Sequence, residues 1–266
     1  MTATHISNRR VAVTSGRSAV RRVTRQPGVL VFTAVFYLMV TVALSSVWRA
    51  AAETSGGALV GYTAAAFTWY VATSESVIIS LPQRLIYDIA EDVRSGHILG
   101  EMVRPTPTIV GRIATQIGTA LPRLGICVVI GFAFCSLVAG LPTSWSAIAL
   151  AAPAAVLAIS TNIAGQHAFA ASSFWFRDAG SAWFLYQKIV FVGGGMLIPL
   201  EVLPDAVNGW LRLLPFAAMA YTPARLASGH VEPELLLLQA GWLAVFVLLA
   251  ARAFGAGERH LMRVGA

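Results

Sequence analysis

Residues 124–176 read LGICVVIGFAFCSLVAGLPTSWSAIALAAPAAVLAISTNIAGQHAFAASSFWF and contain no Asp, Glu, Lys or Arg. A helix needs about 20 apolar residues to cross the hydrocarbon core of a bilayer, so this run is long enough for two crossings. Gly140-Leu141-Pro142-Thr143-Ser144 interrupts the run with turn-forming residues. The stretch therefore predicts two membrane-spanning helices joined by a short turn.

The rest of the chain repeats this pattern on both sides. Of the 266 residues, 57% are hydrophobic and 12% are charged, whereas about a quarter of the residues of a soluble domain are charged. Further apolar runs cover residues 26–48, 54–83 with Glu75 inside the run, about 181–200 and about 235–251. We therefore predict an all-α polytopic membrane protein with six transmembrane helices, organised as one transmembrane domain over residues 1–266.

Basic residues predict the orientation, because Arg and Lys near span ends stay in the cytoplasm. With the amino terminus inside, most arginines fall on the cytoplasmic side, and only Arg49, Arg212 and Arg225 fall outside. We expect both termini to be cytoplasmic, in the inner membrane of a bacterium. Residues 1–26 are read as an amphipathic helix on the lipid surface or as a disordered basic tail. The net charge of +7 is spread along the chain, so no nucleic-acid partner is expected.

Several kinds of chemistry have no counterpart in the sequence. The only lysine, Lys188, is followed by Ile189, so no Walker A motif is present and any ATP would be hydrolysed by another chain. Cys127, Cys135 and the five histidines show no metal-ligand spacing, so we expect no metal site. An intramembrane enzyme is disfavoured because no serine and histidine pair or aspartate pair lies in facing spans.

The predicted cytoplasmic segment 83–112 is patterned. Leu85, Ile89 and Val93 recur at helical spacing with charged residues on the other faces, which predicts an amphipathic helix. Ser95-Gly96 ends it, and a second short apolar face follows until Arg104-Pro105. Such a helix is either a knob for a cytoplasmic partner or an element floating in the headgroups.

Residues 199–234 form a second unusual segment. They are too apolar for an exposed loop and too polar for a full span, and prolines divide them into short pieces. A pair of short helices partly immersed in the outer leaflet is the physical compromise, either as a cap on the bundle or as an exit gate.

Both segments carry a family resemblance. Asp92-Val93-Arg94-Ser95-Gly96-His97, followed by Met102-Val103-Arg104-Pro105, resembles the loop between spans two and three of type-2 ABC transporter permeases of the exporter class. The later segment resembles the short extracellular helices of that family through Gly195, Ile198-Pro199-Leu200, Leu203-Pro204, Trp210, Leu214-Pro215-Phe216, Tyr221, Pro223 and Gly229. The resemblance implies an ATPase-coupling helix that includes Asp88, Glu91, Asp92, Val93, Arg94, Gly96, His97 and Arg104, and an extracellular gate with Pro199, Pro204, Trp210 and Pro215.

The same resemblance implies a function and partners. The chain would be the permease subunit of an exporter, paired with a second copy or a related permease and with two ATP-binding cassette ATPase subunits. Those subunits would bind ATP and Mg, and this chain would need no cofactor of its own. Apolar spans with few fixed charges favour a lipophilic or amphiphilic cargo, and membrane lipids surround the bundle.

Three ionisable residues interrupt the spans: Glu75, Arg123 and Lys188. Intramembrane charge is costly and indicates function by default, so we predict that Glu75 pairs with Arg123 or Lys188 in the cytoplasmic half. Snorkelling of the two bases is the alternative, and an ATP-independent secondary transporter or channel that uses all three residues is the alternative function. Asn162 and Gln166 either face the translocation path or bond neighbouring helices.

Overall fold

The computed structural model describes residues 8–103, 107–176, 179–195 and 199–264, and these residues are mostly helical. The elements are α1 Asn8–Thr24, α2 Pro27–Thr54, β1 Ala58–Leu59, β2 Tyr62–Thr63, α3 Ala64–Ser80, α4 Leu85–Arg94, α5 His97–Met102, α6 Thr108–Val138, α7 Trp145–Ala170, η1 Ala171–Phe174, α8 Ala179–Gly193, η2 Leu200–Val202, α9 Asp205–Leu213, α10 Pro215–Met219, α11 Tyr221–Ala227 and α12 Glu234–Val264. The two short strands pair antiparallel and form a hairpin.

Five helical segments in the described part of the chain are long and apolar enough to cross a membrane. They are Pro27–Thr54, Ala64–Arg94, Thr108–Val138, Trp145–Phe174 and Glu234–Arg263. The predicted span 181–200 corresponds to α8, an apolar helix of 15 residues that ends at Gly193. At 1.5 Å per residue it is about 22 Å long, shorter than the hydrocarbon core. The predicted all-α polytopic membrane fold is confirmed.

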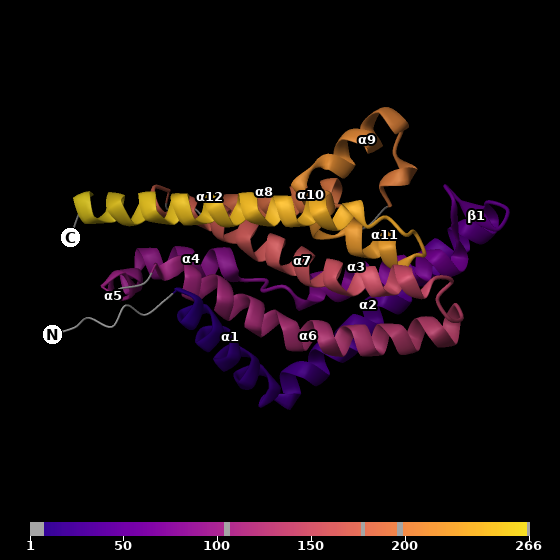
Figure 1. Cartoon of the computed structure of the whole chain (residues 1–266), viewed down its shortest axis with the longest axis horizontal. Helices are drawn as coiled ribbons and strands as arrows, with labels where there is room; N and C mark the ends of the chain where they lie inside the picture. The colour runs from indigo at the N-terminus through magenta and orange to yellow at the C-terminus, as the bar shows by residue number, and fades with distance from the viewer. Residues whose placement is uncertain (1–7, 104–106, 177–178, 196–198, 265–266) are drawn as a thin grey trace.

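The helices form an elongated bundle whose two ends differ (Figure 1). The start of α1, both α4 and α5, and the end of α12 lie together at one end, which we call the α4–α5 end. The β1–β2 hairpin and the turn between α6 and α7 lie at the opposite end, which we call the hairpin end. Helix α9 stands away from the bundle on the side of α10 and α11.

Two helix limits differ from the sequence prediction. Helix α2 continues past Trp48 to Thr54, and α6 begins at Thr108, so that Arg123 lies at its middle and not near its start. Charged residues ended the predicted spans, but a helix tolerates a charge wherever it finds a partner or leaves the apolar layer. Arg112, predicted to close the cytoplasmic loop, lies on α6 and has two acidic partners.

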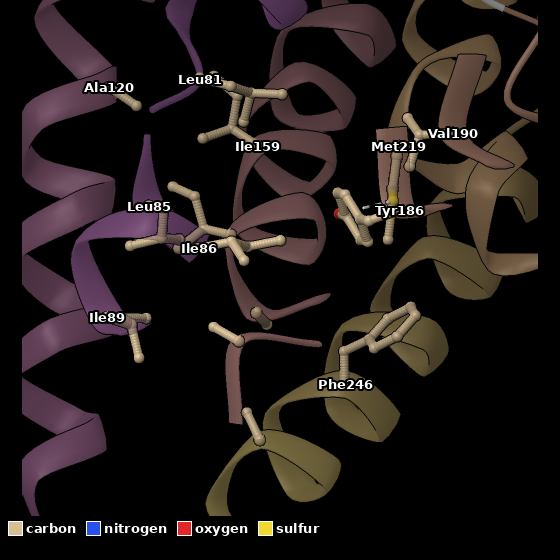
Figure 2. Packing of buried hydrophobic residues seen from close by; sticks show 14 of the residues in the cluster. Leu81, Leu85, Ile86, Ile89, Ala120, Ile159, Tyr186, Val190, Met219 and Phe246 are labelled. Atoms are coloured by element: carbon tan, nitrogen blue, oxygen red, sulfur yellow. Dashed lines mark hydrogen bonds between the residues drawn. The ribbon is translucent and has the colours of Figure 1, made fainter. Parts of the chain in front are cut away.

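The main core links α4 to the spanning helices. Figure 2 shows Leu85, Ile86 and Ile89 of α4 directed into the space between α6, at Ala120, and α7, at Ile159. All three α4 side chains are buried. Helix α4 also contacts α8 and η1, so it is an integral part of the bundle.

Helix α1 packs against α6 through two glycines. Gly16 and Gly118 lie so close that a Cβ on Gly118 would overlap the backbone oxygen of Gly16. Ala19 and Val23 are buried, while the arginines Arg17, Arg21 and Arg22 are exposed. The reading of this segment as a disordered basic tail is therefore wrong, because residues 8–24 form a docked helix.

The glycine contact makes a direct prediction. Gly118→Ala places a methyl group against backbone that cannot rotate away, and overpacking of this kind costs about 1–3 kcal/mol. We expect α1 to detach, the melting temperature of the purified protein to fall, and trypsin to cut faster at Arg17. Gly125→Ala is the matched control, because no atom lies within 4 Å of a Cβ at that position of the same helix. Equal trypsin rates for the two variants would contradict the predicted contact.

Candidate functional site

The α4–α5 segment presents a different surface from the predicted one. The predicted apolar face of α4 contacts the protein's own core, since Leu85 and Ile89 are buried and Val93 packs against the same cluster. Leu85 and Ile89 are therefore not available to a partner and Val93 is only partly exposed, which corrects the expectation that the three form the apolar part of the knob. The floating-helix alternative is also wrong, because α4 is anchored in the bundle. The exposed side consists of Arg84, Tyr87, Asp88, Glu91, Arg94, Ser95, His97, Leu99, Gly100 and Val103.

One arginine of α6 holds both short helices. Nη2 of Arg112 lies 2.6 Å from Oδ2 of Asp92 on α4, and its Nε lies 2.8 Å from Oε2 of Glu101 on α5. The arginine side chain is 16% exposed and each carboxylate side chain is 32% exposed. Charge-assisted bonds at this depth are stronger than exposed ones because less water competes. Arg112 therefore joins both α4 and α5 to α6 through a double contact.

The remaining predicted coupling residues lie around this clamp. Glu91 and Arg94 form an exposed pair at 2.6 Å, and Asp88 faces Arg84 at 3.9 Å. Gly96 adopts φ +76 between α4 and α5, a left-handed conformation that favours glycine. His97 is exposed at the start of α5. Arg104 lies outside the described residues. The sequence pointed to Asp92 but not to its partner Arg112 or to Glu101, the second carboxylate that Arg112 contacts.

The predicted ion pair between intramembrane charges is absent. No ion pair joins Glu75 to Arg123 or Lys188, all three of which the structure describes. Oε1 of Glu75 and Nε of Arg123 are buried without a hydrogen-bond partner. Lys188 is exposed on α8, with its ammonium 5.2 Å from the ring centre of Phe184. Glu75 is thus buried and Arg123 partly buried, and no ion pair joins them.

Glu75 and Arg123 nevertheless line the same cavity. Its volume is about 550 Å³, within the range of about 300–1,000 Å³ that is typical of small-molecule sites. Residues of α2 form most of its apolar wall, and Phe191 of α8 completes it. The cavity is lined by Val29, Phe32, Thr33, Phe36, Val40, Leu44, Glu75, Ile78, Ile79, Leu81, Gln83, Arg123 and Phe191.

Asn162 and Gln166 lie in a neighbouring, smaller cavity. Gln166 donates to Oδ1 of Asn162 at 2.9 Å, and the hydroxyl of Tyr186 donates to the same oxygen at 2.9 Å. The cavity of about 40 Å³ next to them shares Ile78, Leu81, Gln83 and Phe191 with the larger one. Asn162 and Gln166 therefore bond to each other, and Asn162 bonds to α8. The cavity beside them and the cavity lined by Glu75 have lining residues in common.

The hairpin end holds a charged network that sequence reasoning did not foresee. Oε1 of Glu201 lies 2.6 Å from Nη2 of Arg212 and 2.8 Å from Nη1 of Arg225, and it accepts a bond from the hydroxyl of Tyr221 at 2.5 Å. Arg225 also donates to the hydroxyl of Tyr62 on the hairpin at 3.0 Å. Glu201 is 11% and Arg225 13% exposed, so the network ties the segment after α8 to the hairpin.

Protonation states in this network follow from its surroundings. Burial, and next the adjoining carboxylate of Glu201, raise the pKa of the Tyr221 phenol above its ordinary value, so the phenol keeps its proton and donates. Burial lowers the pKa of Arg225, but Tyr62, Tyr221 and Glu201 together raise this pKa by more than burial lowers it, so the net direction is upward. Both groups therefore keep the protonated forms that the network requires.

The four residues of the predicted gate take separate places. Pro199 and Pro215 are buried, and each stands at the start of a short helix, η2 and α10 respectively. Pro204 precedes α9, and Trp210 on α9 is 75% exposed. Nothing brings the four together in one contact, and their role as a gate stays a prediction.

No group of three or more His, Cys, Asp or Glu side chains suited to a metal ion occurs among the residues that the structure describes. Cys127 and Cys135 are buried free thiols. A family model described as an ABC-2 family transporter protein matches residues 30–265. No curated protein matches the chain.

Proposed function

The chain belongs to the ABC-2 transporter family, and from this premise we propose that it is the permease subunit of an ATP-driven exporter. Two ATP-binding cassette ATPase subunits, which bind ATP and Mg, would sit against the α4–α5 end. A second copy of this chain or a related permease would complete the transporter. The complex would lie in a bacterial inner membrane with both termini in the cytoplasm, and it would carry a lipophilic or amphiphilic compound outward.

The double contact of Arg112 with Asp92 and Glu101 carries this proposal. An external ATPase needs a stiff surface to push on and a rigid connection from that surface into the spans. The α4–α5 segment supplies an exposed surface, and the clamp together with buried Leu85, Ile86 and Ile89 supplies the connection.

The ATP-independent alternative has less support. A relay through Glu75, Arg123 and Lys188 requires the three groups to exchange protons or ions in sequence. Lys188 does not line the cavity that Glu75 and Arg123 share, and it is exposed on α8. Transport by the purified permease with neither ATP nor ATPase would favour this alternative over the proposal.

Co-purification tests the proposed ATPase contact. Leu99 is 41% exposed on α5, so Leu99→Glu leaves the core intact and places a charge where the ATPase would dock. We expect at least tenfold less ATPase to co-purify with the folded variant, because a desolvated unpaired carboxylate disfavours an interface. Leu141→Glu is the control, since Leu141 is 68% exposed in the turn between α6 and α7, which lies at the opposite, hairpin end of the bundle (Figure 1). Full ATPase recovery with Leu99→Glu would count against this docking surface.

A further inference from the structure

Two residues that line the 550 Å³ cavity, Glu75 and Arg123, each have one buried polar atom without a hydrogen-bond partner. Glu75 is 3% exposed, and its Oε1 accepts no hydrogen bond. Leaving a buried acceptor unsatisfied costs free energy, more so for a carboxylate than for a neutral group. A ligand that donates a hydrogen bond to this oxygen would remove that cost.

The cavity is lined by one acidic and one basic side chain, which do not pair with each other. Arg123 is the only other charged residue among those that line it, and no ion pair joins its guanidinium to Glu75 although both face the same space. A purely cationic ligand would meet the repulsion of Arg123, and a purely anionic one that of Glu75. A ligand with one group of each sign satisfies both residues.

The remaining wall is apolar and elongated. Residues from Val29 to Leu44 on α2 line the cavity, and at 1.5 Å per residue they extend over about 22 Å. Phe32 and Phe36 stack along this wall with ring centres 6.1 Å apart. Such a wall suits a hydrocarbon chain attached to the charged groups.

We propose that this cavity binds a zwitterionic amphiphile, with an ammonium N–H donor at Glu75, an anionic group at Arg123 and an apolar chain along α2. The inference rests on the proposed function, because it names the class of cargo that the permease carries. A membrane phospholipid with an ethanolamine headgroup and a water-soluble N-alkyl amino acid share this chemistry.

Binding to the purified permease, without ATP or ATPase, tests the inference. The probes share a twelve-carbon chain: N-dodecyl-β-alanine carries both charges, whereas dodecylamine and dodecanoate carry one each. We expect the zwitterion to bind at least tenfold more tightly than either single-charge probe. Glu75→Gln and Arg123→Gln should each remove that advantage, while Lys188→Gln should not change it, because Lys188 does not line the cavity.

Mass spectrometry of lipid that co-purifies distinguishes the two sources. Ethanolamine lipid retained by the wild type and lost from Glu75→Gln identifies a membrane lipid as the ligand; binding of N-dodecyl-β-alanine without retained lipid identifies a soluble amphiphile. Equal affinity for all three probes, or unchanged affinity in both cavity variants, would overturn the inference. A third result would also overturn the inference: no probe binds, and Glu75→Gln and Arg123→Gln each lower the melting temperature, whereas the variant with both substitutions melts like the wild type. In that case Glu75 and Arg123 would pair with each other and not with a ligand.

The outcome is separable from that of the proposed function. Zwitterion binding that depends on Glu75, combined with no ATP-driven transport by the assembled complex, would refute the exporter and leave the binding site. ATP-driven export of another compound, without zwitterion binding, would refute the inference and leave the exporter.

Discussion

Arg112→Glu is expected to reduce ATP-driven transport at least tenfold while the ATPase subunits still co-purify and still hydrolyse ATP. The substitution puts a third carboxylate beside Asp92 and Glu101, whose side chains are each 32% exposed. Losing one partner of a buried ion pair costs about 3–5 kcal/mol, and this half-buried clamp lies at the lower end. The exposed surface of α4–α5 would keep its chemistry, but its movement would no longer reach α6. Transport and ATP turnover are measured on the same reconstituted complex.

Two further variants make this result specific. Arg252→Glu makes the same charge reversal at an exposed position of α12, and we expect transport close to that of the wild type. The triple variant Arg112→Glu, Asp92→Arg and Glu101→Arg inverts every charge of the clamp, so it should recover part of the lost transport. If Arg112→Glu alone transports normally, the clamp does not couple the short helices to α6.

The helices were predictable from the sequence because the bilayer imposes a simple rule on it. A run without charges must be helical in lipid, because only a helix bonds its own backbone there. Both helices that flank residues 140–144 were predictable for this reason, and the turn between them was predictable from its turn-forming residues. The same rule ended the first span before Arg49 and placed Arg123 near the start of the third, because it takes charges at the edges of an apolar run as helix boundaries. Helix α6 instead begins before Arg112, whose charge has acidic partners on α4 and α5.

The site was less predictable, for a different physical reason. Asp92 was identified, but its partner Arg112 lies 20 residues away in the chain. No local sequence pattern predicts which of the many arginines contacts Asp92. The pairing predicted for Glu75 assumed that a buried charge must meet the nearest opposite charge. The helices instead hold Glu75 and Arg123 apart around a cavity. This separation depends on how the helices pack, and the spacing of the two residues along the sequence does not predict it.

Glu201→Ala is expected to be among the most destabilising single substitutions at the hairpin end. One oxygen of Glu201 meets Arg212, Arg225 and the hydroxyl of Tyr221. Its removal leaves two guanidinium groups with no shared counter-charge, and the expected cost is about 3–5 kcal/mol. Arg225 keeps Glu232 at 2.9 Å, so the loss falls mainly on η2 and α9. We expect a lower melting temperature and faster proteolysis within residues 199–214.

The comparison between Glu201→Gln and Asp205→Ala tests the cause of that effect. Glutamine keeps an acceptor oxygen for Tyr221 but loses the charge, so its effect should be intermediate if the two arginines need a carboxylate. Asp205 is exposed in the first turn of α9, where an acidic residue contributes only about 0.3–1 kcal/mol. Because the α4–α5 end is untouched, ATPase recovery should be normal in all three variants. Equal melting temperatures for Glu201→Ala and Asp205→Ala would show that the network does not hold this segment in place.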